Sequence, residues 1–202
     1  MKNQKSKILY LITAAAIISV LFVFSSCKNN GDGGREVFSQ QGGEYEIMLM
    51  PDEWTAVSEF NRTGDLSLMH EPSGAVMILS CYKKTNASGA GISDLNGFIN
   101  YYKNLETDDN PYKFGTDITA GDLTAVNKSD FKGSVFNLGK NQKISAKYAQ
   151  AGTENTVEVI TEVIYLESKN HYFAIYYSVM PDKLESAQTG ANDLISHVRK
   201  EK

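Results

Sequence analysis

Two strand-like segments joined by a short turn, near the end of the chain, restrict the fold more than any other pattern in the sequence. Residues 157–166 are rich in β-branched side chains, and residues 172–179 alternate around aromatic side chains, so both are predicted strands. The polar turn at 167–170 is too short for a parallel crossover, which takes about a dozen residues or more. We therefore expect an antiparallel hairpin, ended by Pro181.

An amphipathic helix is predicted directly after this hairpin. Its apolar side chains recur mostly at steps of three or four residues and share one side: Leu184, Ala187, Ala191, Leu194, Ile195 and Val198. The other side is acidic and polar, whereas a helix lying on a membrane would be rich in Lys or Arg there. We expect the helix to pack on the sheet.

The preceding part of the chain adds more strands and one more helix. The helix is predicted from Leu95 to Leu105, with Ser93 as its N-cap and Pro111 after its end. Strands are predicted at residues 45–49, 54–60, 66–69 and 75–82, and shorter ones near 115–119, 122–128, 132–138 and 143–149. The predicted fold class is α+β: a central antiparallel β-sheet flanked by α-helices.

The N-terminus has the composition of a targeting segment. Three lysines precede an apolar run at residues 8–24, and the run ends in Phe24-Ser25-Ser26-Cys27. This ending resembles the bacterial lipobox, with Phe24 where an aliphatic residue is usual. The resemblance implies that residues 1–26 are a lipoprotein signal peptide and that Cys27 carries the lipid, with acyl chains such as palmitate. An uncleaved signal anchor is the alternative.

A polar, glycine-rich stretch follows Cys27 and buries too little apolar surface to repay its ordering. We expect a flexible tether at residues 27–41 and one folded domain at residues 42–202. The protein would then be lipid-anchored in the cell membrane and face the extracytoplasmic side.

The order of motifs in the expected domain resembles the PsbP-like family. The resemblance rests on Tyr45-Glu46-Ile47, on Pro51-Asp52-Glu53-Trp54, on Ala120-Gly121 and on the closing hairpin from Tyr165 to Ser178. It implies a PsbP-like α/β/α sandwich, and bacterial members of the family are often lipoproteins. The family includes a photosystem subunit and a Ran-binding factor, so its fold does not select a function.

Few residues suggest chemistry. His70, His171 and His197 are too far apart in sequence for a local metal motif, and Cys81 lies in an apolar run and is expected to be buried. Removing the signal peptide takes the net charge from −4 to −7, because it carries three lysines and no acidic residue. That balance argues against nucleic-acid binding and against a polybasic membrane patch. We expect no cofactor, no metal and no catalytic residue.

Two patterns remain as candidate sites. Tyr165, Tyr172 and Tyr176 could form a stacking surface for a ligand, although aromatic residues at alternating strand positions also suit a core. Glu158 and Glu162 share one strand face and could be a carboxylate pair, although solvent-facing charges that protect a sheet are the simpler interpretation.

The function expected from these features is that of a non-catalytic, membrane-anchored binding or assembly module of the cell envelope. Its partner would be an envelope protein or a small ligand. The alternatives are an envelope hydrolase with dispersed catalytic residues and a small-ligand-binding lipoprotein.

Overall fold

A computed structural model describes residues 34–39, 45–57, 65–105, 110–113, 115–126, 134–149, 153 and 155–201. The expected signal peptide and Cys27 lie outside these residues.

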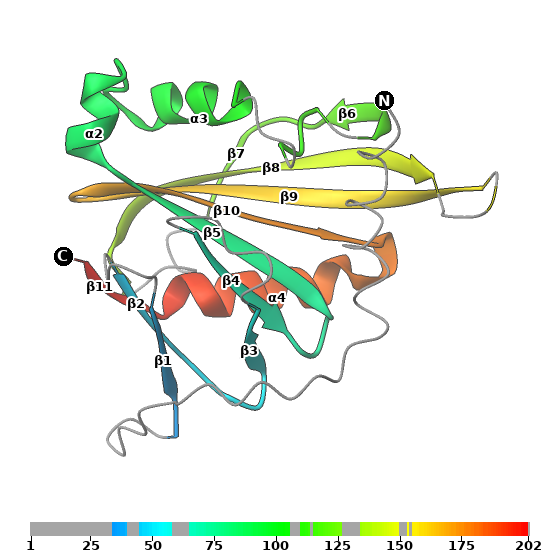
Figure 1. Cartoon of the computed structure of the whole chain (residues 1–202), viewed down its shortest axis with the longest axis horizontal. Coiled ribbons are helices and arrows are strands. Elements are labelled where there is room, and N and C mark those ends of the chain that lie inside the picture. The colour runs from blue at the N-terminus through cyan, green and yellow to red at the C-terminus, as the bar shows by residue number, and fades with distance from the viewer. Residues whose placement is uncertain are drawn as a thin grey trace.

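A large antiparallel sheet forms the centre of the molecule (Figure 1). Its strands, from one edge to the other, are β3 (Trp54–Ala56), β4 (Asp65–His70), β5 (Ala75–Lys83), β10 (His171–Val179), β9 (Thr156–Ser168), β8 (Phe136–Ala149) and β6 (Thr116–Ala120), with β7 (Thr124–Ala125) also on β8. The predicted closing hairpin is β9–β10, in which Tyr172 pairs with Glu167 and Val179 with Ile160.

A smaller sheet has the order β1 (Glu36–Ser39), β2 (Tyr45–Leu49) and β11 (Val198–Glu201). Two expectations are wrong here. Strand β1 lies inside the segment expected to be a tether, because it pairs along its whole length with β2. Val198 belongs to β11 and pairs with Ile47, so it is not part of the terminal helix.

Helices lie on both faces of the large sheet (Figure 1). They are α2 (Lys84–Gly89), α3 (Leu95–Lys103), the short 3₁₀ helix η3 (Pro181–Lys183) and α4 (Leu184–Ser196). Helix α2 was not predicted. The N-cap of α3 is Asp94 rather than Ser93, because the Asp94 Oδ1 accepts a hydrogen bond of 2.7 Å from the Gly97 N–H.

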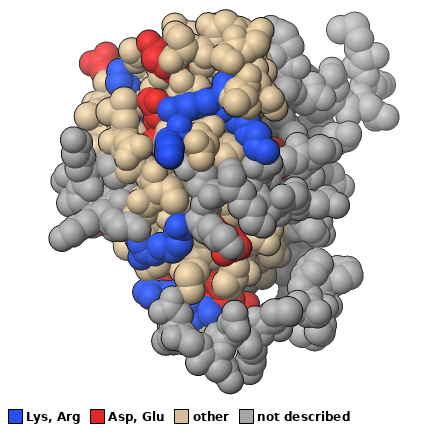
Figure 2. All heavy atoms as spheres, turned by 90° about the vertical axis from the view of Figure 1, so that its left-hand side faces the viewer, with Lys and Arg blue, Asp and Glu red and all other residues tan. Residues whose placement is uncertain are grey.

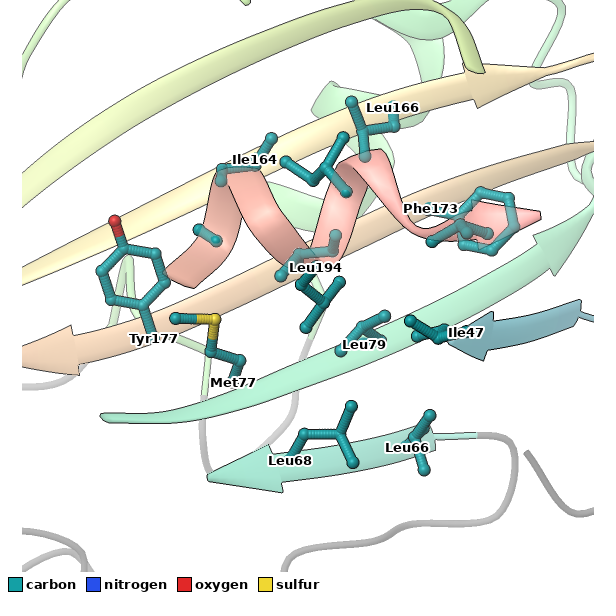
Figure 3. Close-up of a cluster of buried hydrophobic side chains, with 14 of the residues drawn as sticks. Ile47, Leu66, Leu68, Met77, Leu79, Ile164, Leu166, Phe173, Tyr177 and Leu194 are labelled. Carbon is teal, nitrogen blue, oxygen red and sulfur yellow. The ribbon is translucent and has the colours of Figure 1, made fainter. Parts of the chain in front are cut away.

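Alternate residues of β10 point into two separate cores, which confirms the α+β class and its layers. Phe173, Ile175 and Tyr177 pack with α4 and the small sheet, whereas Tyr172 and Ala174 pack with α2 and α3. The predicted apolar stripe of α4 is confirmed: Ala187, Ala191, Leu194 and Ile195 are buried, and Leu184 is partly buried. Figure 3 shows Leu194 among side chains of the sheet.

Residues 114–150 differ most from prediction. The two strands expected near 132–138 and 143–149 are one strand, β8, of 14 residues. Strand β6 forms one edge of the sheet and is irregular, because Asp117 has a φ of 52° and the register shifts between Thr116 and Thr119.

At the other edge, the described strand β3 has three residues and ends at Ala56, whereas the predicted strand ran to residue 60; residues 58–60 lie outside the described part.

Candidate functional site

The three tyrosines expected to form a ligand surface all point to the α3 side of the sheet, but two of them are core residues. Tyr165 is 0% and Tyr172 is 2% exposed, and Tyr176 is half-buried. The Tyr172 ring stacks on Phe98 of α3 with centroids 5.1 Å apart. Helix α3 therefore covers two of the three rings. Tyr165 and Tyr172 are core residues and do not form a ligand surface.

Tyr165 begins a chain of hydrogen bonds that leads out of this core. Its hydroxyl lies 2.8 Å from that of Tyr112, which donates to the Gln142 Oε1 at 2.8 Å. The Gln142 Nε2 in turn donates to the carbonyl oxygen of Gly121. Burial raises the pKa of Tyr112 to about 12 and raises that of Tyr165 further, so both hydroxyls stay protonated at neutral pH.

Glu162 lies on the opposite face and is 2% exposed, so the interpretation as a solvent-facing charge is wrong. Its carboxylate accepts three hydrogen bonds: from the Asn141 Nδ2 at 2.6 Å, from the Tyr177 hydroxyl at 2.5 Å and from the Gln188 Nε2 at 2.9 Å. Thr124 of β7 extends the cluster by donating to the Asn141 Oδ1. One carboxylate thus joins β8, β9, β10 and α4.

The Glu162 cluster is a buried acceptor surrounded by neutral donors. Burial, together with the neighbouring Glu162, raises the pKa of the Tyr177 hydroxyl well above its usual value, so Tyr177 remains a donor. Glu158, which shares the strand face in sequence, is exposed and accepts a hydrogen bond from Ser145. The two glutamates therefore do not act as a pair. Residue parity could have revealed this site, since Glu162 and the buried Ile164 are two residues apart and therefore point to the same face of β9.

His70 anchors a third polar cluster, between β3, β4 and α4. Its ring is 5% exposed, contacts the Trp54 ring at 4.9 Å between centroids, and places Nδ1 2.9 Å from the Ser73 Oγ. The Trp54 Nε1 donates to Asp193 of α4 at 3.2 Å, and His197 lies 3.1 Å from the same carboxylate. Burial lowers the pKa of His70, against an opposing effect of nearby carboxylates.

The other sequence candidates stay apart. His171 is buried at the start of β10, and Cys81 is half-buried at the margin of the α4 core. Within the described residues, no three His, Cys, Asp or Glu side chains gather in a way that could hold a metal ion. No helix in that part of the chain is long and apolar enough to cross a membrane.

Comparison with known proteins yields structural likenesses only. No family model and no curated protein matches the chain. A solved protein from Bacteroides thetaiotaomicron is similar with a TM-score of 0.50 and 11% identity over 82% of this chain, which spans about half (48%) of that protein. The Ran-binding protein Mog1p of Saccharomyces cerevisiae (TM-score 0.44, 11% identity, 81% of this chain, 86% of that one) and the cyanobacterial PsbP of Synechocystis sp. PCC 6803 (0.48, 10%, 87%, 98%) are also similar. Likenesses at this identity concern the fold alone.

Proposed function

We propose that the chain is a lipoprotein of the cell envelope whose folded domain is a non-catalytic binding or assembly module. The observation that carries this proposal is the position of the first described strand. Strand β1 starts at Glu36, nine residues after Cys27, so the domain would be held close to the membrane by a short link. A diacylglycerol on Cys27 would supply two acyl chains, enough to make attachment stable without any spanning helix.

The polar clusters support the non-catalytic part of the proposal. The Glu162 carboxylate and the Tyr165 hydroxyl are hydrogen-bonded to neighbouring side chains inside packed layers. Such groups lock strands and helices together, whereas a general acid or base must reach a substrate proton.

The two cysteines of the chain provide a matched test of anchoring. In cells grown with labelled palmitate, Cys27→Ala should abolish labelling and release the protein from membranes, while Cys81→Ala should leave both unchanged. Labelling that persists in Cys27→Ala would refute the proposal. A hydrolase would be indicated instead if the purified chain cleaves envelope esters or glycans and Glu162→Gln removes that activity.

A further inference from the structure

Three lysines meet at one end of the molecule. Lys83 ends β5, Lys84 begins α2, and Lys169 lies in the turn between β9 and β10. The backbone brings them together, because Lys83 pairs with His171 and the Lys84 N–H donates to the Asn170 carbonyl at 2.8 Å. We call these three lysines the basic end. Figure 2 views this side of the molecule and shows Lys and Arg side chains in its upper part, with Asp and Glu side chains beside them.

The basic end carries net positive charge on a negatively charged chain. Lys83 and Lys169 are exposed, and Glu167 forms an ion pair with Lys84, the Nζ lying 2.6 Å from Oε1. Asp94 lies close enough to act on the Tyr172 hydroxyl as well, and with it the three lysines and Glu167 sum to one positive charge. Net charge alone, the basis of the sequence argument against a basic membrane patch, does not report such a local excess.

Tyrosine side chains lie at the same end of the molecule, on the α3 side of the sheet and next to Lys84. Tyr101 of α3 is 39% exposed, and its ring centroid is 6.2 Å from that of Tyr82, the residue before Lys83. The Lys84 Nζ lies 5.1 Å from the centroid of the Tyr172 ring. Tyrosine is favoured where one part of a side chain meets apolar surroundings and another meets water, and lysine stems extend across such boundaries.

We propose that the basic end, together with Tyr101, docks on the anionic phospholipid headgroups of the membrane that holds Cys27. This inference rests on the proposed function, because it is the lipid that brings the domain to the bilayer. The nine residues from Cys27 to Glu36 span at most about 32 Å when extended, so a lipid on Cys27 would keep the start of the domain within about that distance of the bilayer surface. The positive charge of the basic end selects anionic lipid, and the exposed tyrosine ring enters the interface.

Amine labelling of the full-length lipidated chain in vesicles tests the docking. Vesicles of phosphatidylcholine alone are compared with vesicles that also contain phosphatidylglycerol, using a water-soluble acylating reagent. We expect acylation of Lys83 and Lys169 to fall at least severalfold on the anionic vesicles and to recover in high salt. Lys183 is the internal control, since it is exposed and precedes α4 at the opposite end of the molecule (Figure 1).

A pair of variants adds a second readout. Lys169→Gln should reduce the protection of Lys83 on anionic vesicles, whereas Lys183→Gln should not. Equal acylation rates on the two kinds of vesicle would overturn the docking, and so would equal protection of Lys183. If inorganic phosphate protects Lys83 and Lys169 from acylation on neutral vesicles, the basic end binds a soluble anion. That result would overturn the docking on membrane lipids. A chain that washes off neutral vesicles refutes the anchoring itself, and the docking with it.

Discussion

Gly190 offers a test of the packing between α4 and His70. A Cβ atom at this position would lie 2.6 Å from the His70 Nδ1 and less than 3 Å from two further ring atoms. The ring has little room to retreat, because it contacts Trp54 and Ser73 and is 5% exposed. Overpacking of this kind costs about 1–3 kcal/mol. Alanine within a helix regains about 0.5–1 kcal/mol over glycine, so Gly190→Ala should be destabilising by up to about 2 kcal/mol.

Gly97 of α3 is the matched control. A Cβ there meets nothing closer than the Asp94 Oδ1 at 3.5 Å, an ordinary contact, so Gly97→Ala should stabilise the domain by about 0.5–1 kcal/mol. The melting temperatures of the two variants should differ by several degrees, because each kcal/mol corresponds to about 2–4 °C. In a His70→Ala background, Gly190→Ala should become stabilising. Equal stabilisation by Gly190→Ala and Gly97→Ala in the natural sequence would refute the argument.

Three further perturbations test other parts of the structure. Leu194→Ala should cost about 2–5 kcal/mol in urea unfolding, while Leu138→Ala, at a side chain 44% exposed, should change stability by less than about 0.5 kcal/mol. Glu162→Ala leaves the buried Tyr177 hydroxyl and two half-buried amide donors without their acceptor and should cost about 2–4 kcal/mol, against little change for the exposed Glu158→Ala; similar losses for both would contradict the cluster. Burial lowers the pKa of His70, so as pH falls through about 6.5 this histidine is protonated in the unfolded chain before it is protonated in the folded one. The free energy of unfolding should therefore decline in this pH range. The decline should be smaller in His70→Gln.

The parts of the fold that the sequence predicts well are those with a strong local period. Residues 45–49 alternate in polarity and form β2 with the predicted bounds, and the hairpin of β9 and β10 starts and ends within two residues of prediction. In each segment, local pattern and tertiary packing favour the same structure. The prediction errors fall where the local pattern and the tertiary packing favour different structures. Strand β8 contains the polar run Gly139 to Lys143, which looks like a break, but its pairing with β9 continues through that run.

The polar clusters could be predicted only in part. The alternation of the strand places Glu162 on the face of Ile164, but its three donors come from residues 21, 15 and 26 positions away. No local pattern indicates which distant side chains will converge. The basic end could not be predicted for the same reason. Lys83 and Lys169 are far apart in sequence and lie at one end of the molecule only because β5 and β10 are neighbours in the sheet.

The irregular edge at β6 bears on how such molecules behave when crowded on a surface. A growing β-aggregate needs a straight row of backbone groups, and the left-handed Asp117 with its register shift interrupts that row. At the opposite edge, the described part of the chain gives β3 three residues. Within the described residues, both edges of the large sheet are therefore poor templates for a further straight strand from another copy.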